Sequence, residues 1–283
     1  MDEASLQLWH WIRHDRSIAY CRIESVRVEP AGSDEQVHLR LRTLETLSGP
    51  PAIEPRTVTF AQPSSERARL KSKTPVWDGV ELKAGLEILY VAKAGKDGGE
   101  PLFAANTSKD DPSLAAVREI ARRERALGGE PAAAKAQYLA WLGEGRLVHR
   151  LFAGQALARD SIPGVDAKGE VAAAMAAILA DEASDAFLRL SLVEWANTHL
   201  WKKTAPRGKI AILRADAAAL GAKDQNLRRF ALDALVDLDT LRLQQEGVAD
   251  AAVASLLRER AGALAEPEHA ALERLAQALT PRH

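Results

Sequence analysis

The sequence predicts an α+β protein of two domains: a small antiparallel β-barrel at residues 1–110, then an α-solenoid of about four helix pairs at residues 111–283. The first part contains short runs rich in β-branched and aromatic residues, separated by turn-forming residues, which is typical of strands. After Pro112 these runs give way to segments rich in Ala and Leu, which are strong helix formers. A length of 283 residues with 47% hydrophobic content is enough for two cores.

Five segments of the first domain have the composition of strands. They are IAYCRIESVRVEP, EQVHLRLRTLETL, RTVTF, GLEILYVAK and PLFAAN. In the second segment Val37, Leu39 and Leu41 alternate with polar residues, so one face of this strand should be buried. In the first segment the apolar positions change parity between Ile23 and Val26, which predicts a β-bulge. The turns AGSDE and AGKDGGE favour antiparallel pairing of neighbouring strands.

Three motifs give this domain a family resemblance. LETLSG ends the second strand, TVTF forms the third, and LKAGLEILYVA contains the fourth. Their order resembles the five-stranded OB-type barrels of the netrin-like kind, and this resemblance implies an OB-like fold. The inhibitors of that family use an amino-terminal cysteine. Because this chain has Met1 at that position, the inhibitory mechanism is not implied.

The second domain is predicted to begin with one helix and to continue with four helix pairs. The first helix, PSLAAVREIARRERAL, has Pro112 at its start and Gly128 and Gly129 at its end, as helix boundaries often do. The helix pairs are expected at residues 131–158, 168–200, 207–238 and 249–279.

The second helices of these pairs resemble one another. They are GRLVHRLFAGQALAR, DAFLRLSLVEWANTHL, QNLRRFALDALVDL and HAALERLAQAL. Equating Phe187 with Leu227 gives a spacing of 40 residues, within the period of HEAT and armadillo units. An acidic residue at the turn is followed by an arginine: Glu144 with Arg150, Asp185 with Arg189, and Asp224 with Arg228 or Arg229. The arrangement resembles the HEAT repeat family, in which stacked helix pairs bury a continuous core, although the usual proline of the first helix is missing.

In the third pair, one stripe of the second helix, QNLRRFALDALVDL, is expected to form part of this core. Its members follow i, i+3, i+4 spacing and are Leu227, Phe230, Ala231, Ala234, Leu235 and Leu238. We therefore predict that Phe230→Ala costs about 3 to 5 kcal/mol of folding free energy, as for a buried aromatic residue.

The segment LWHWIRHDRSIAYC, residues 8–21, is the first candidate site. On a helix, His10 and His14 would lie on one face at the i, i+4 spacing that two metal-binding imidazoles need. Asp15 or Cys21 would have to complete such a site. The simpler interpretation is that this segment docks on the barrel through an apolar stripe, so we expect no metal and no cofactor. That stripe consists of Leu6, Trp9 and Ile12.

Residues 195–214, WANTHLWKKTAPRGKIAILR, form the second candidate site. Aromatic and basic side chains close together can stack on bases and hold phosphates. Lysines near a helix carboxyl end are also favoured by the helix dipole, and tryptophans near a repeat core are usually packed. The candidate binding residues of this segment are Trp195, His199, Trp201, Lys202, Lys203 and Arg207.

Composition narrows the functional classes. Lys+Arg 38 against Asp+Glu 39 gives a net charge of −1, without the basic excess of many nucleic-acid-binding domains. Cys21 is the single cysteine, so the chain has neither an internal disulfide framework nor a multi-cysteine zinc site. The sequence has no apolar run of about 18 residues, so we expect no membrane span. The opening MDEASLQLW lacks the features of a secretory signal, which predicts a cytoplasmic protein, or a periplasmic or secreted one if a leader has been removed.

The sequence lacks the G-x-S-x-G, G-x-x-x-x-G-K-[ST] and H-E-x-x-H motifs, so we predict that the chain is not an enzyme. The leading prediction is an OB-like barrel followed by a HEAT-like solenoid that acts as a binding or scaffold protein for another protein, through the repeat surface, the barrel or both. His149, Arg228 and Asp233 are expected near the groove of the solenoid. One alternative is nucleic-acid binding through residues 195–214; a second is an enzyme or enzyme inhibitor with an unfamiliar site.

Overall fold

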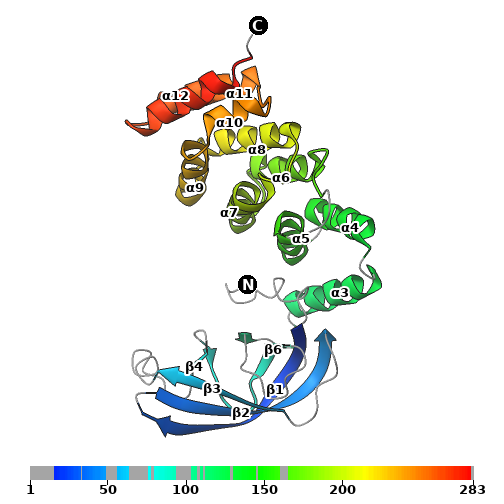
Figure 1. Cartoon of the computed structure of the whole chain (residues 1–283). Helices are drawn as coiled ribbons and strands as arrows, with labels where there is room; N and C mark the ends of the chain where they lie inside the picture. The colour runs from blue at the N-terminus through cyan, green and yellow to red at the C-terminus, as the bar shows by residue number, and fades with distance from the viewer. Residues whose placement is uncertain are drawn as a thin grey trace. The chain divides into compact units, whose positions relative to one another are not determined.

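The computed structural model divides the chain into two units, residues 1–128 and 129–283. Among the described residues, strands and one helix occur in the first unit, and the second unit is helical (Figure 1). No helix in the described part of the chain combines the length and apolar character needed to cross a membrane. The structure describes residues 16–32, 34–48, 56–63, 76–77, 80–93, 103–106, 109–110, 112–127, 130–144, 146–159 and 165–281.

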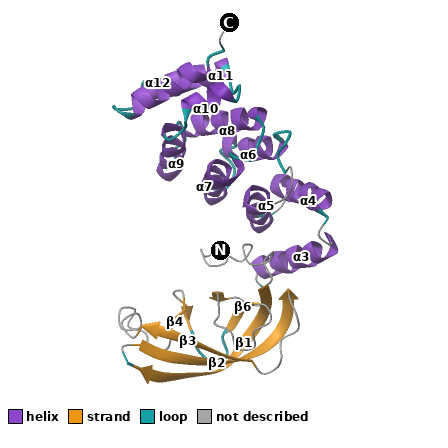
Figure 2. Ribbon diagram, in the orientation of Figure 1, coloured by secondary structure: helices purple, strands orange, loops and turns teal. Residues whose placement is uncertain are grey.

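The first unit contains a curled antiparallel sheet, which forms a half-barrel (Figure 2). Its strand order is β3-β2-β1-β6-β7, so the long strand β1 pairs with both β2 and β6. The predicted antiparallel pairing is confirmed, and β3 and β7 are the edges of this sheet. The strands are β1 (Arg16–Ala31), β2 (Asp34–Ser48), β3 (Arg56–Pro63), β6 (Glu87–Lys93) and β7 (Phe103–Asn106), with β4 (Val76–Trp77) and β5 (Val80–Glu81) pairing separately.

The pattern of apolar residues in β1 and β2 accounts for the core of this sheet. Val37, Leu39 and Leu41 are buried as the alternation predicted. The register of β1 against β2 shifts between Ile23 and Ser25, so the predicted bulge is confirmed. The bulge reverses the parity of the strand and lets Val26 pack against the same core.

Helix α3 (Pro112–Leu127) belongs to the first unit, although the sequence placed it after the domain boundary at residue 110. It contacts β2, and the Arg118 guanidinium forms an ion pair with Glu45 at 2.6 Å. Its apolar face is buried, with Leu114, Val117 and Ile120 inaccessible to solvent. An amphipathic helix of this kind is stabilised mainly by the packing of its apolar face.

In its described residues, the second unit contains the four predicted helix pairs and one additional short helix, α10. A π-helical turn, η1, continues α7. The elements are α4 (Pro131–Glu144), α5 (Leu147–Arg159), α6 (Glu170–Ala180), α7 (Ala186–Trp195), η1 (Ala196–Leu200), α8 (Pro206–Ala219), α9 (Gln225–Val236), α10 (Thr240–Gln245), α11 (Ala251–Ala261) and α12 (Glu268–Leu279).

The contacts between helices follow a regular order (Figure 1). Within each pair the two helices pack together: α4 on α5, α6 on α7, α8 on α9, and α11 on α12. The first helices also contact one another in succession, α4 on α6, α6 on α8, and α8 on α11. The second helices do the same, α5 on α7, α7 on α9, and α9 on α12. Each pair therefore packs mainly against its neighbours in the sequence.

Three arginines, spaced 39 residues apart, make the same type of contact. Each donates to a carbonyl oxygen at or just after the end of the preceding helix, where such oxygens lack an intrahelical partner. The pairs are Arg150 with Leu142 O at 3.0 Å, Arg189 with Leu179 O at 3.1 Å, and Arg228 with Ala222 O at 2.7 Å. Of the two arginines that the sequence left open in the third copy, Arg228 therefore holds the equivalent position.

This spacing corrects the equivalence of Phe187 with Leu227. The helix caps Asp185 and Asp224 each accept a hydrogen bond from the amide three residues later, that of Leu188 or Leu227. Leu188 and Leu227 are both buried, whereas Phe187 is exposed. Leu188 is thus the residue equivalent to Leu227, because the cap and the arginine fix the register of each second helix.

Phe230 also departs from its prediction. Its side chain is 45% exposed, whereas Leu227, Ala231 and Leu235 on the same helix are buried. The buried face of α9 is narrower than the apolar stripe in its sequence, and Phe230 lies at the margin of that stripe. The predicted loss of 3 to 5 kcal/mol for Phe230→Ala is therefore too large, because that range applies to fully buried aromatic residues.

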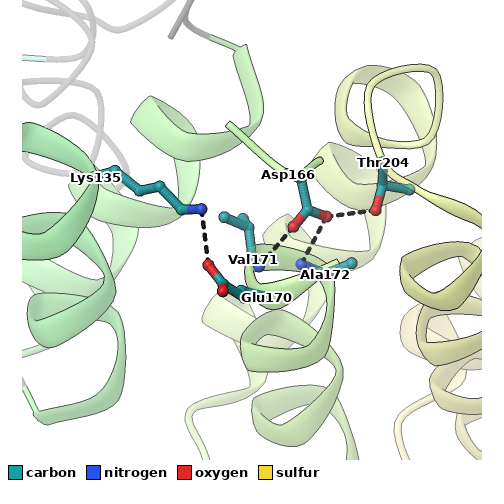
Figure 3. A network of polar contacts seen from close by, with 6 residues as sticks. All are labelled: Lys135, Asp166, Glu170, Val171, Ala172 and Thr204. Atoms are coloured by element: carbon teal, nitrogen blue, oxygen red, sulfur yellow. Dashed lines mark hydrogen bonds and ion pairs between the residues drawn. The ribbon is translucent and has the colours of Figure 1, made fainter. Parts of the chain in front are cut away.

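Asp166 links the start of α6 to the start of α8 (Figure 3). Its carboxylate accepts hydrogen bonds from the amides of Val171 and Ala172, at 2.8 and 3.1 Å, and from the Thr204 hydroxyl at 2.5 Å. Gly208 allows the two helices to approach, because a β-carbon there would lie 3.0 Å from Ala172 Cβ of α6 and 3.1 Å from Gly169 Cα at the start of α6. Asp166 is fully buried and serves as a cap shared between two helix pairs.

Candidate functional site

A groove of about 370 Å³ lies between α7 with its π turn and α9, and we call it the α7–α9 groove. Its apolar wall contains Val193 from α7 together with Phe230 and Ala234 from α9, and Leu238 just after α9. Phe230 is the most exposed large apolar side chain of this wall, at 45%. An exposed aromatic ring that adjoins other apolar groups at a groove can anchor another molecule there.

The polar part of the groove is acidic. The carboxylates of Glu194, Asp233 and Asp237 line it, and no lysine or arginine is among its described lining residues. Asp233 forms an ion pair with Arg229 at 3.0 Å, one turn away on the same helix. Within the described ranges, which include the lining of the groove, no three His, Cys, Asp or Glu side chains are grouped closely enough to hold a metal ion.

The π turn η1 places Asn197 on the groove. Its side-chain amide donates to Val193 O at 3.0 Å and to Asp216 Oδ2 at 2.9 Å, so it connects α7 with α8. Thr198, the next residue, donates its hydroxyl to Glu194 O at 2.6 Å. π turns inserted in α-helices are frequent at functional sites, because the extra residue redirects the side chains around it.

Asp216 is fully buried beneath this turn. Burial raises the pKa of its carboxyl to about 7, and the hydrogen bond from Asn197 opposes this rise. Its second oxygen, Oδ1, has no hydrogen-bond partner within the described part of the chain. A carboxyl in this environment can change its protonation state near neutral pH.

The basic tryptophan segment, residues 195–214, is largely engaged in packing. Trp195 is buried, and its ring lies 3.1 Å from the position that a β-carbon on Gly154 would take. His199 Nε2 accepts a hydrogen bond from Arg159 Nε at 3.0 Å, and desolvation, with the nearby Arg159 and Lys203, lowers the pKa of this imidazole. The Lys203 ammonium donates to Ala158 O at 2.9 Å, and desolvation lowers its pKa.

The remaining residues of this segment are also partly packed and partly exposed. Trp201 is half-buried, and the ammonium of Lys209 lies 5.4 Å from its ring centroid. Lys209 itself is buried and forms an ion pair with Glu246. Lys202 and Arg207 are exposed. The structure thus separates the predicted cluster into internal contacts and three exposed cations, Lys202, Lys203 and Arg207, of which Lys203 also donates to backbone carbonyls.

The three polar residues expected near a groove lie in different environments. Asp233 lines the α7–α9 groove. His149 is buried and stacks on Trp141, with 5.3 Å between ring centroids. The 39-residue register explains this, because His149 occupies the position of the core residues Leu188 and Leu227. Arg228 is held by backbone carbonyls before α9 and does not line the groove.

Sequence reasoning missed Glu194, Asn197, Asp237 and Asp216. The 39-residue register was the available signal for Glu194, because it equates this residue with Asp233, which the sequence had placed near the groove. Asp216 lies three residues after Leu213 on the apolar face of α8, where a charged residue is unusual. His10 and His14 lie outside the described residues.

Searches among family models, curated proteins and solved structures find no match for this chain. The resemblances to OB-type barrels and to HEAT repeats therefore depend on motifs in this sequence. The geometry of the α7–α9 groove is the basis for a functional proposal.

Proposed function

We propose that this chain is a non-enzymatic scaffold protein whose helical unit, a HEAT-like solenoid, binds a protein partner in the α7–α9 groove. The observation that carries the proposal is the exposed ring of Phe230 on the wall of this groove. Exposing an aromatic ring forgoes the stabilisation that its burial would give, so a large exposed apolar side chain beside a groove favours a role in binding.

The helix contacts support the HEAT-like part of the proposal. In stacked repeats each unit contacts its neighbours, and the second helices together line one face. Here second helices contact second helices, and the three arginines repeat every 39 residues with the same capping role. The α7–α9 groove lies between two successive second helices, where repeat proteins commonly bind their partners.

The half-barrel supports a second part of the proposal, that the first unit is an OB-like domain. A central strand β1 paired with β2 and β6, and bent at a bulge, is consistent with the Greek-key barrels of that class. Its role would be a further contact surface for the same assembly. The α7–α9 groove is the primary site in this proposal, because it combines an exposed aromatic ring with three carboxylates.

A protein partner suits the α7–α9 groove better than a nucleic acid does. Three carboxylates line the groove, and they would repel a phosphate backbone. In the basic tryptophan segment, the charge of Lys209 is already balanced by Glu246, which reduces the charge available for phosphates. The apolar wall offers what a protein interface needs at its centre, a desolvated aromatic contact.

Site-specific photo-crosslinking tests the proposal. A photoreactive phenylalanine analogue at position 230 should crosslink a protein partner in the source cells. The matched control is the same analogue at Leu241, which is also an exposed large apolar residue but does not line the groove. A partner captured at position 230 and not at 241 would support the proposal. Equal capture at both positions, or capture of nucleic acid at position 230, would contradict it.

A further inference from the structure

We infer that the α7–α9 groove takes an amphipathic α-helix of its partner, with Lys or Arg side chains next to a large apolar side chain. This inference rests on the proposed function and adds the chemistry of the partner. It is carried by two features of the groove: the arrangement of its carboxylates beside an apolar row, and the helical backbone of both walls.

The charges of the groove select for a cationic partner. Asp233 already has a counter-ion in Arg229, but Glu194 and Asp237 have no ion pair among the described residues. A partner that covered Phe230 would also remove water from these neighbouring carboxylates. Removing water from an unpaired carboxylate is unfavourable unless a cation or a hydrogen-bond donor replaces it. Lysine or arginine side chains supply both.

The spacing of the residues along α9 gives the groove two rows. Phe230, Ala234 and Leu238 follow one another at intervals of four residues, and so do Asp233 and Asp237. Each interval corresponds to about 6 Å along a helix. A partner helix can match this repeat with two neighbouring rows of side chains, one apolar and one basic. Within each row the residues are four positions apart.

The backbone of the groove favours a helical partner over an extended one. An extended segment has free backbone amides and carbonyls that need partners when water is excluded. Both walls are helical, so their own backbone groups are largely bonded internally. The Asn197 amide and the Thr198 hydroxyl are already engaged with Val193, Asp216 and Glu194. A helix satisfies its own backbone and needs only side-chain contacts.

Fluorescence anisotropy with labelled peptides and the full chain tests this inference. The probe is an amphipathic helix of about 16 residues, or about four turns, with Leu and Phe on one face flanked by Lys at i, i+4. Two matched probes replace every Lys with Gln or with Glu. We expect saturable binding of the Lys peptide that weakens with added salt, at least tenfold weaker binding of the Gln peptide, and none of the Glu peptide.

Variants of the protein locate the binding. Glu194→Gln combined with Asp237→Asn should weaken binding of the Lys peptide by tenfold or more, and Phe230→Ala should do the same. The control, Glu182→Gln combined with Glu259→Gln, neutralises exposed carboxylates outside the groove and should leave binding unchanged. Circular dichroism of each variant checks that it is folded.

Three results would overturn the inference. The Gln peptide could bind as tightly as the Lys peptide, or the groove and control variants could lose affinity equally. The chain could instead form a dimer that Phe230→Ala abolishes in sedimentation, which would make a second copy the occupant. Each of these results is compatible with a partner crosslinked at position 230, so the proposed function and this inference fail separately.

Discussion

Two buried carboxylates of the helical unit, Asp166 and Asp216, differ in how many hydrogen bonds they accept. Both are inaccessible to solvent. Asp166 accepts from two backbone amides and from the Thr204 hydroxyl, so both of its oxygens are used. Asp216 accepts from the Asn197 amide at one oxygen, and its other oxygen has no partner within the described ranges. The first carboxylate is thus well satisfied and the second is not.

This difference suggests that Asp166 holds its helices in fixed positions, whereas the contact between Asp216 and Asn197 is less rigidly held. A buried carboxylate with three donors fixes the elements that provide them, here the starts of α6 and α8. For a buried carboxylate with one donor, the hydrogen bond does not offset the loss of water around the charged form. The pKa of Asp216 therefore rises to about 7. Asp216 also contacts Asn197, which lines the α7–α9 groove. The less rigidly held contact therefore lies beside the candidate binding site.

Removing the well-satisfied carboxylate should have the largest effect on stability. Asp166→Ala leaves two amides and one hydroxyl without their acceptor, and each lost partner costs about 1 to 3 kcal/mol, so we expect a loss of at least about 3 kcal/mol. Chemical denaturation followed by circular dichroism measures it. Asp166→Asn keeps one acceptor oxygen and should lose less. A loss below about 1 kcal/mol in the alanine variant would show that this junction is not fixed by Asp166.

The poorly satisfied carboxylate should make stability depend on pH. The pKa of Asp216 is about 7 when folded, against an ordinary value of 3.8, so between these values the folded chain holds a proton that the unfolded chain has released. Its contribution to the unfolding free energy is fully present below pH 3.8 and is lost as the pH rises through about 7. The slope is about 1.4 kcal/mol per pH unit, or about 2 kcal/mol between pH 5 and 6.5.

The variant Asp216→Asn isolates this contribution, because it cannot titrate and keeps an acceptor for Asn197. Denaturant melts at a series of pH values should show a smaller decline for the variant than for the wild type across this range. Above about pH 7 the difference between the two chains should become constant. Parallel curves for the two chains from pH 4 to 8 would show that Asp216 has an ordinary pKa.

The sequence predicted the features that depend on local periodicity. Alternation in β2, the bulge after Ile23 and the bounds of the helix pairs follow from spacing along the chain. The register of the repeat was out by one residue, because Phe187 and Leu188 are adjacent apolar residues and the cap that distinguishes them acts through hydrogen bonds. Asp216 and the groove carboxylates were missed because their roles depend on contacts between helices. The short helix α10 was missed because six residues are too few to show a period.

The junction held by Asp166 also depends on a close approach of two helices, which Gly208→Ala should disturb. The added β-carbon would lie 1.8 Å from Thr204 Oγ1 and 3.1 Å from Gly169, so the hydroxyl that bonds Asp166 must move. We expect a loss of about 1 to 2 kcal/mol, as for other overpacked sites. Gly143→Ala is the matched control, because its β-carbon meets no atom within 4 Å and should add up to about 1 kcal/mol. Equal thermal shifts for the two variants would argue against a tight junction.

The smallest effect on stability is expected at the groove itself. Phe230→Ala removes a ring that is already 45% exposed, so we expect a loss of about 1 kcal/mol or less. Leu235→Ala, on the buried face of the same helix, should cost about 2 to 5 kcal/mol. Denaturant melts of both variants compare the two faces of α9 directly. If Phe230→Ala were as costly as Leu235→Ala, the ring would be part of the core. A small loss of stability together with a tenfold loss of peptide affinity would instead show that Phe230 acts in binding.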